Sequence, residues 1–360
     1  MDTPALVIDL DAMERNLAAM AAYAATHRIA HRPHAKMHKC AAIAALQMRA
    51  GAVGVCVQKL SEAEVLADAG VPDIFISNEI VDPGKLARFA TLAGRIRLSI
   101  AVDSALGVDR LAAALKTAGT RAEVLVEIDV GQGRCGVAAT AAGALAHQVV
   151  SHGLSFAGLQ AYHGGAQHLR SAAAREAATR HVVALVRAAQ ASITSAGMQC
   201  PRVTGAGTGS FVFETASGVY DELQAGSYLF MDRDYADNDA APQAPVFEHA
   251  LFVKSQVISR GVSHAVVDAG HKSHAIDSGL PRVWQRELDY ANGGDEHGIL
   301  RPNATATGAE LPSLGQTVWL VPGHCDPTVN LHDHLIALRG GLAQGVVESV
   351  WPVDARGCLN

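Results

Sequence analysis

Several features that would assign this chain of 360 residues to a common class of protein are missing from it. The net charge is −6 and no basic run occurs, so nothing in the sequence indicates nucleic-acid binding. No apolar run is long enough to span a membrane, and the first residues lack the basic region, apolar core and cleavage site of a secretory signal. The six cysteines form no CxxC pair, which is typical of reduced thiols. We therefore expect a cytoplasmic protein that binds neither membranes nor nucleic acids.

The first two-thirds of the chain alternate between strand-like and helical patterns. Hydrophobic residues make up 49% of the sequence, which is enough for a large core, and the length favours two domains. Strands are expected near 29–36, 53–57, 73–77, 97–102, 123–129, 156–162, 202–206 and 222–226, and helices near 41–50, 61–69, 83–93, 105–118, 138–152, 171–196 and, more weakly, 210–220. This alternation predicts an α/β fold, a (β/α)₈ TIM barrel; a doubly wound open sheet is the alternative.

The two ends of the chain follow other patterns. Residues 5–10 are expected to form a strand, with Asp11 as the N-cap of a helix that runs to about Ala25. Residues 234–245 are polar and contain two prolines, which indicates a linker. Strand-like segments follow at 250–258, 264–268, 317–322, 334–339 and 345–350. We expect a barrel over residues 10–235 and a mostly β domain over 236–360, which the N-terminal strand in residues 1–9 joins.

Polar residues follow the predicted barrel strands at their carboxyl ends, where the active sites of such barrels lie. Lys36 is the first of them, in the segment Arg32-Pro33-His34-Ala35-Lys36-Met37-His38-Lys39-Cys40. Because Pro33 favours extended geometry before it, Lys36 is expected at or near the end of a strand, a position that suits a Schiff-base lysine. The alternative is that Lys36 and Lys39 are solvated charges at the start of a helix.

A glycine-rich segment follows the seventh predicted barrel strand. Residues 204–210 read Thr-Gly-Ala-Gly-Thr-Gly-Ser, whose backbone N–H groups can approach an anion, with Thr208 and Ser210 as further hydroxyl donors. Gly226 and Ser227 follow the eighth strand. Such barrels often bind a phosphate in these two loops. Together with a lysine on the first strand, the pattern predicts pyridoxal phosphate; taken alone, the glycine-rich segment would be an ordinary turn.

A second pattern of interest lies in the predicted β domain. His324 and Asp326 follow the strand at 317–322, and in an extended chain they point to one side while Cys325 points to the other. A histidine and a carboxylate together suit Mn²⁺, Mg²⁺ or Zn²⁺. Nearby His332, Asp333 and His334 are further possible ligands, for which a structural role is the alternative.

Several segments together resemble one enzyme group, the fold-type III pyridoxal phosphate enzymes that include D-threonine aldolase- and D-serine dehydratase-like proteins. The segments are TPALVIDLDA (3–12), RPHAKMHKC (32–40), VGQGRCG (130–136), GLQAYHGGAQH (158–168), TGAGTGS (204–210), SGVYDELQAGSYLFMD (217–232) and PGHCDPTVNLHD (322–333). The resemblance covers nearly the whole chain.

The resemblance implies roles for individual residues. Lys36 would carry the cofactor and His168 would act as the catalytic base. The other cofactor-binding residues would be Gln58, Arg134, Tyr162, Thr208, Gly226, Ser227 and Tyr228. Arg134 would face the pyridine nitrogen, which a guanidinium leaves unprotonated; a structural salt bridge is its alternative role. The aldolases of this group have His-x-Asp at the metal motif and the dehydratases His-x-Cys, and His324 and Asp326 here have the aldolase form.

The expected activity is cleavage of a D-β-hydroxy-α-amino acid of the D-threonine type to glycine and an aldehyde. It would require pyridoxal phosphate and a divalent metal, with Mn²⁺ first and Mg²⁺, Co²⁺ or Zn²⁺ as alternatives. A dehydratase, an amino-acid racemase and a non-catalytic cofactor carrier are the other possibilities. Hydroxyaspartate becomes a substrate candidate if Arg233, His271 or His274 reaches the pocket. The family also implies a homodimer.

Overall fold

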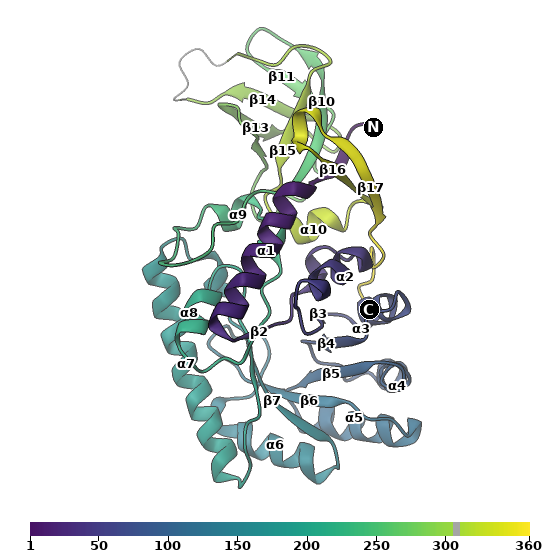
Figure 1. The fold of residues 1–360 in the computed structure, drawn as a ribbon, viewed down its shortest axis with the longest axis vertical. Helices are drawn as coiled ribbons and strands as arrows, with labels where there is room; N and C mark the ends of the chain where they lie inside the picture. The colour runs from purple at the N-terminus through teal and green to yellow at the C-terminus, as the bar shows by residue number, and fades with distance from the viewer. Residues whose placement is uncertain (305–309) are drawn as a thin grey trace.

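The computed structural model describes residues 1–304 and 310–360, and these residues build two sheets (Figure 1). The first sheet has eight parallel strands in the order β2–β9–β8–β7–β6–β5–β4–β3. They are β2 (Ala30–His31), β3 (Val55–Val57), β4 (Asp73–Ile76), β5 (Arg97–Val102), β6 (Glu123–Glu127), β7 (Ser155–Ala161), β8 (Val203–Gly205) and β9 (Glu222–Leu223). Each predicted barrel strand is present, so the TIM-like α/β fold is confirmed.

The barrel closes between β2 and β3, its first two strands. The Val53 N–H donates to the His31 carbonyl and the Cys56 N–H donates to the Pro33 carbonyl, both at 2.9 Å. The chain then enters a single 3₁₀ turn, η1 (Ala35–Met37), which carries Lys36. Lys36 therefore lies near the end of the strand, as predicted: regular pairing of β2 with β9 stops at His31, and a parallel bridge joins His34 to Cys56 two residues before Lys36.

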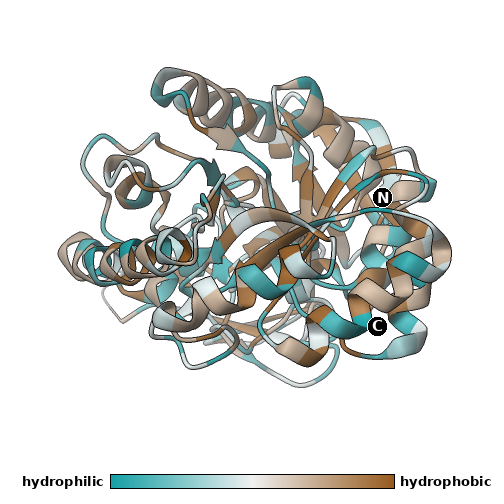
Figure 2. Cartoon of the chain, turned by 90° about the horizontal axis from the view of Figure 1, so that it is seen from below, coloured by the Kyte–Doolittle hydropathy of each residue, from teal (hydrophilic) through white to brown (hydrophobic). Residues whose placement is uncertain are grey.

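Helices cover the outside of the barrel. They are α1 (Leu10–His27), α2 (Ala41–Arg49), α3 (Leu60–Asp68), α4 (Pro83–Leu92), α5 (Ala105–Ala118), α6 (Ala142–Ser151), α7 (Ala172–Ser195) and α8 (Phe211–Ala216). The loops contain the 3₁₀ turns η2 (Ala139–Ala141), η3 (Gly164–His168) and η4 (Ser227–Leu229). The central strands are largely hydrophobic, whereas the helices contain both hydrophilic and hydrophobic residues (Figure 2). None of the helices in residues 1–304 and 310–360 is long and apolar enough to cross a membrane.

The cap of α1 differs from the prediction. Asp9 is the N-cap, and its carboxylate accepts the Ala12 N–H at 3.1 Å. Asp11 lies in the first helical turn, where it instead accepts a hydrogen bond from Arg339 at 2.7 Å. The helix begins earlier than predicted because Asp9 ends strand β1 and caps the helix at once, with no residue between the two elements.

Buried ion pairs hold the strands together near their amino ends. Arg32 is 2% exposed, and its guanidinium contacts Asp73 on β4 at 2.6 Å and Glu222 on β9 at 3.1 Å. Glu222 also accepts from the Thr204 hydroxyl at 2.9 Å and lies 3.8 Å from Arg202. The Arg32 side chain thus connects the barrel across its seam.

The second sheet contains nine strands, eight of them from the C-terminal part of the chain. They are β1 (Ala5–Asp9), β10 (Leu251–Arg260), β11 (Ala265–Val267), β12 (Arg282–Val283), β13 (Leu288–Asn292), β14 (Gly298–Pro302), β15 (Thr317–Val321), β16 (His334–Arg339) and β17 (Val346–Pro352). Strand β1 lies between β10 and β16, antiparallel to the first and parallel to the second. The sequence did not indicate β12, β13 and β14, which are short or interrupted by polar residues.

Three short helices belong to the C-terminal part: α9 (Arg233–Ala236), α10 (Cys325–Val329) and α11 (Gly341–Gln344). Helix α9 lies at the start of the segment predicted to be a polar linker. Asp232, its N-cap, and Asp234 are both buried, so the segment does not begin as a solvated connection. The backbone N–H groups of Arg233 and Asp234 donate to the carbonyls of Pro322 and Gly323, each at 3.1 Å. These bonds tie the end of the barrel to the β domain.

Candidate active site

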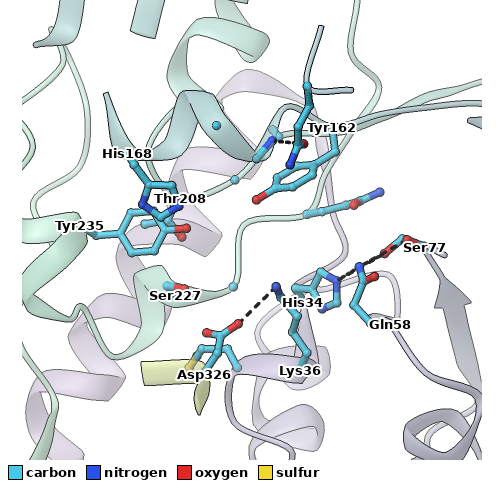
Figure 3. Close-up of a pocket in the computed structure, with 18 of the residues that line it drawn as sticks. His34, Lys36, Gln58, Ser77, Tyr162, His168, Thr208, Ser227, Tyr235 and Asp326 are labelled. Carbon is cyan, nitrogen blue, oxygen red and sulfur yellow. Dashed lines mark hydrogen bonds and ion pairs between the residues drawn. The ribbon is translucent and has the colours of Figure 1, made fainter. Parts of the chain in front are cut away.

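A cavity of about 370 Å³ lies at the carboxyl ends of the barrel strands, between the barrel and helices α9 and α10 (Figure 3). Ten of the eleven predicted site residues line it: Lys36, Gln58, Arg134, Tyr162, His168, Thr208, Gly226, Ser227, His324 and Asp326. The cavity is also lined by residues that no sequence pattern indicated, namely His34, Ser77, Gln160, Gln224 and Tyr235. His34 was within reach of sequence reasoning, because it lies two residues before Lys36.

Lys36 and Asp326 lie next to each other in the cavity wall (Figure 3). The Lys36 Nζ lies 3.3 Å from Asp326 Oδ2, and the lysine side chain remains 40% exposed because it opens onto the cavity. Burial alone would lower the pKa of Lys36, but the Asp326 carboxylate outweighs burial and raises that pKa above its ordinary value. A carboxylate from the β domain therefore lies beside the amine carried by the barrel.

His324 and Asp326 are brought together by a helix start rather than by extended chain. His324 is the N-cap of α10 and keeps extended geometry, whereas Cys325 and Asp326 form the first turn of that helix. The His324 Nε2 lies 3.7 Å from Asp326 Oδ1. Cys325 is fully buried, and its backbone N–H donates to Asp232 Oδ2 at 2.9 Å. Cys325 thus lies apart from the His324–Asp326 pair, as predicted, but the extended backbone that this prediction assumed is wrong.

The chemistry of this pair fits a divalent cation. Asp326 Oδ1 is buried and, within residues 1–304 and 310–360, accepts no hydrogen bond. His324 bonds through Nδ1 to Asp232 Oδ2 at 2.7 Å, so its Nε2 is available on the cavity side. Burial alone would lower the pKa of His324, but the Asp232 and Asp326 carboxylates raise it to about 9. An unpaired carboxylate oxygen beside a histidine nitrogen is a donor set that Mn²⁺, Mg²⁺ or Zn²⁺ can use.

His168 is also anchored by a buried carboxylate. Its Nδ1 lies 2.6 Å from Asp234 Oδ2, while the Arg170 guanidinium binds Asp234 Oδ1. Burial alone would raise the pKa of Asp234, but its hydrogen bonds to His168 and Arg170 lower it to about 2. Because Asp234 is ionised at neutral pH, it accepts the proton on Nδ1. His168 Nε2 is then the ring nitrogen left for the cavity.

The loops after β8 and β9 form the opposite wall. Ala206, Gly207, Thr208, Gly226 and Ser227 line the cavity there. A Cβ at Gly207 would lie 2.5 Å from the Gln167 side chain, and one at Gly226 would lie 2.7 Å from the His34 carbonyl. Close packing behind the backbone therefore favours glycine at both positions, and a glycine that lines the cavity exposes its main chain there. This wall fits a phosphate group.

Two predicted hydroxyl-bearing residues of this wall do not face the cavity. The Tyr228 side chain is fully buried behind the loop, where its hydroxyl accepts from Gln47 Nε2 at 3.3 Å. Its backbone N–H donates to Thr208 Oγ1 at 3.0 Å, so Tyr228 supports the wall through the main chain. Ser210 is buried as well, and its hydroxyl bonds to Gln167 and Glu214. The sequence could not reveal these orientations because each residue lies on a tight turn.

Arg134 and Gln58 lie on the remaining sides of the cavity. The Arg134 guanidinium lies 5.5 Å from the centroid of the Tyr162 ring and 3.8 Å from Glu127 Oε1. Gln58 Nε2 lies 3.0 Å from both His34 Nε2 and the Ser77 hydroxyl. Arg134 thus has both the position for contact with a ring in the cavity and a carboxylate behind it.

Residues considered for binding a second substrate carboxylate lie elsewhere. Arg233 donates to the Leu280 carbonyl at 2.7 Å, and His271 pairs with Asp295 at 2.8 Å. His274 is fully buried in the β domain, and none of the three lines the cavity. Of the additional possible metal ligands, His332 bonds to the Ser273 carbonyl at 2.8 Å and is likewise outside the cavity.

Comparison with known proteins assigns the family. The sequence pattern of the alanine racemase N-terminal domain matches residues 8–234, and that of a serine dehydratase domain matches residues 250–338. The chain is 46% identical to a D-threonine aldolase from Arthrobacter sp. over 362 residues, which cover 99% of this chain and 93% of that protein. The chain belongs to the D-threonine aldolase family. The enzymes of this family use pyridoxal phosphate and have fold type III, and three of the relatives found are named aldolases, which are lyases.

Other relatives show the breadth of this family. A 3-hydroxy-D-aspartate aldolase from Paracoccus denitrificans is 41% identical and is matched over 99% of this chain and 92% of its own length. The crystal structure of D-threonine aldolase from Filomicrobium marinum has a TM-score of 0.95 and 48% identity, covering 100% of this chain and 97% of that one. Alanine racemase from Clostridium difficile, at 13% identity and a TM-score of 0.74, shares the fold alone.

Proposed function

We propose that this member of the D-threonine aldolase family cleaves a D-β-hydroxy-α-amino acid of the D-threonine type into glycine and an aldehyde. The observation that carries the proposal is the 3.3 Å contact between Lys36 Nζ and Asp326 Oδ2. An amine site and a metal-type donor pair thus lie next to each other. If the substrate places its amine at the Lys36 site and its β-hydroxyl at the His324–Asp326 pair, its Cα–Cβ bond lies between the two sites.

In this proposal, Lys36 would carry pyridoxal phosphate. Gly207, Thr208, Gly226 and Ser227 would hold its phosphate group, and Arg134 and His34 would hold its ring. The cofactor, when bound, accepts the electron pair that cleavage leaves at Cα. A guanidinium has hydrogen-bond donors and no acceptor, so Arg134 can donate to a ring nitrogen without protonating it.

His324 and Asp326 are the proposed metal ligands, with Mn²⁺ the first candidate and Mg²⁺, Co²⁺ or Zn²⁺ as alternatives. A divalent ion at this pair supplies Lewis acidity, which lowers the pKa of a neighbouring hydroxyl. His168 acts as the general base and takes the β-hydroxyl proton at Nε2. Asp326 and His324 orient the hydroxyl end of the substrate, while Tyr235 fills the wall between His168 and His324, its ring centroid 6.1 Å and 6.2 Å from theirs.

In this proposal, a substrate with an uncharged β-substituent is preferred to one with a second carboxylate. Arg233, His271 and His274, which would have favoured a second carboxylate, do not line the cavity. Hydroxyaspartate therefore ranks below D-threonine even though two relatives are named 3-hydroxy-D-aspartate aldolases. The dehydratase is disfavoured because Asp326 takes the place of cysteine in the metal pair, and Cys325 is buried away from the cavity. A cytoplasmic location and a homodimer stay predictions.

The test is a product analysis with purified protein supplied with pyridoxal phosphate and Mn²⁺. D-Threonine, D-phenylserine, 3-hydroxy-D-aspartate and D-serine are compared, with L-threonine as the stereochemical control. We expect aldehyde and glycine from D-threonine and D-phenylserine, faster than from 3-hydroxy-D-aspartate, and activity that a chelator removes and Mn²⁺ restores. Ammonia and a keto acid as the main products would identify a dehydratase instead. The proposal would be refuted if none of the four D-substrates were turned over.

A further inference from the structure

Two carboxylates in one short segment hold His168 and His324, two of the three histidines that line the cavity. Asp232 Oδ2 lies 2.7 Å from His324 Nδ1, and Asp234 Oδ2 lies 2.6 Å from His168 Nδ1. The side chains of Asp232 and Asp234 are 0% and 5% exposed, respectively. The two histidines come from different parts of the chain, one from the loop after β7 and the other from the β domain.

Hydrogen bonds fix the segment that contains Asp232 and Asp234. Asp232 Oδ1 caps α9 by accepting the Tyr235 N–H at 3.0 Å. The backbone bonds to Pro322 and Gly323 anchor the segment to the chain immediately before His324. Segment and β domain therefore cannot shift independently without breaking hydrogen bonds that are largely buried.

We propose that Asp232 and Asp234 are positioning residues, which orient His324 and His168 through Nδ1 so that the Nε2 atoms of both face one substrate. The proposal rests on the proposed function for its catalytic consequence. Neither aspartate contacts the cavity itself, since neither is among the residues that line it.

His168 depends on such an anchor more than His324 does. Its side chain is 50% exposed, and it ends the 3₁₀ turn η3, which begins with two glycines. Without a partner, an exposed imidazole samples several rotamers and both tautomers. A buried carboxylate on Nδ1 selects one orientation and places the remaining lone pair on Nε2, which is the atom that must accept a proton. Arg170, on the other oxygen of Asp234, keeps that carboxylate charged.

The two substitutions are expected to have different effects, one on turnover and the other on Mn²⁺ binding. Asp234→Asn removes the charge that fixes the His168 tautomer, so we expect kcat for D-threonine to fall about 10²–10⁴-fold, the range for loss of a general base, with KM little changed. Asp232→Asn is expected to weaken Mn²⁺ binding about 10–100-fold, the usual effect of losing a carboxylate behind a ligating histidine. In both variants the cofactor absorbance should remain.

The closing experiment uses the intact enzyme and does not depend on turnover alone. The ¹⁵N resonances of the His168 ring, assigned by their loss in His168→Asn, report which nitrogen is protonated. We expect the Nδ1–H tautomer in the wild type and a shift towards Nε2–H in Asp234→Asn. Mn²⁺ titration of the wild type and Asp232→Asn measures the second effect. Asp237→Asn is the matched control, because Asp237 follows α9 and pairs with Arg282 and Arg233 outside the cavity.

The outcomes separate this proposal from the function it rests on. An Nε2–H tautomer for His168 in the wild type would overturn the role of Asp234 even if the Asp234→Asn variant failed to fold. Unchanged kcat in a folded Asp234→Asn variant would do the same, and unchanged Mn²⁺ affinity in Asp232→Asn would overturn the role of Asp232. A wild-type enzyme inactive on every D-substrate would refute the proposed function, while the tautomer and the Mn²⁺ affinity would still test the two aspartates.

Discussion

Replacing Arg32 with methionine tests whether the barrel seam depends on a buried charge. The substitution keeps an unbranched side chain but removes the contacts to Asp73 and Glu222, at 2.6 Å and 3.1 Å. Breaking a buried ion pair typically costs about 3–5 kcal/mol, because the remaining charge stays buried without its partner. Glu222 keeps the Thr204 hydroxyl at 2.9 Å and Arg202 at 3.8 Å, which places the loss at about 3 kcal/mol.

The measurement is urea unfolding followed by far-ultraviolet circular dichroism, with the midpoint and slope compared between variants. Arg95→Met is the matched control. Arg95 pairs with Asp68 at 2.6 Å, but the two side chains are 52% and 65% exposed, so its loss should cost at most about 1 kcal/mol. If Arg32→Met lowered the free energy of unfolding no more than Arg95→Met does, the buried pairs would not be what holds the seam, and the reasoning would be refuted.

Three further predictions concern the cavity. Lys36→Ala should abolish the cofactor absorbance and Lys39→Ala should keep it, because the Lys39 amine is turned away to Glu62 at 3.2 Å; loss of the absorbance in Lys39→Ala alone would reverse the assignment. His168→Ala should retain that absorbance but cleave D-threonine about 10²–10⁴-fold more slowly, and undiminished turnover would remove it from the mechanism. Asp326→Ala should lose Mn²⁺ in a titration while Cys325→Ala keeps it, since Cys325 is fully buried; the reverse result would indicate a thiolate ligand and favour a dehydratase.

The alternation of strands and helices is the part of the fold that local sequence determines. Strand runs such as Val55–Val57 and Arg97–Val102 are short, β-rich and bounded by helical patterns, so their existence and order can be predicted from neighbouring residues alone. Strands β13 and β14 were not predicted because polar residues interrupt their short apolar runs. Within residues 1–304 and 310–360, β13 pairs with β14, and β14 also pairs with β11. The pairing of β1 with β10 and β16 joins residues far apart in the sequence.

Local sequence likewise determines only part of the candidate site. Lysine, glycine-rich loop and His-x-Asp pair are recognisable from the sequence because each is a compact local pattern with its own chemistry. The orientation of Tyr228 behind its loop and of Ser210 towards Glu214 depends on how tight turns pack against other elements. No local pattern encodes such packing.

The residues that link the two halves of the site show most clearly what required the tertiary structure. By sequence alone, Asp234 belonged to a polar linker, since a polar segment that contains two prolines is usually solvated. In the folded chain it is buried against His168, 66 positions away, and Asp232 is buried against His324, 92 positions away. Sequence determined which reactive groups this protein has, because each group comes with its own residue type. Their distances and tautomers were decided only when the barrel and the β domain packed together, because hydrogen bonds between distant segments form only in the folded chain.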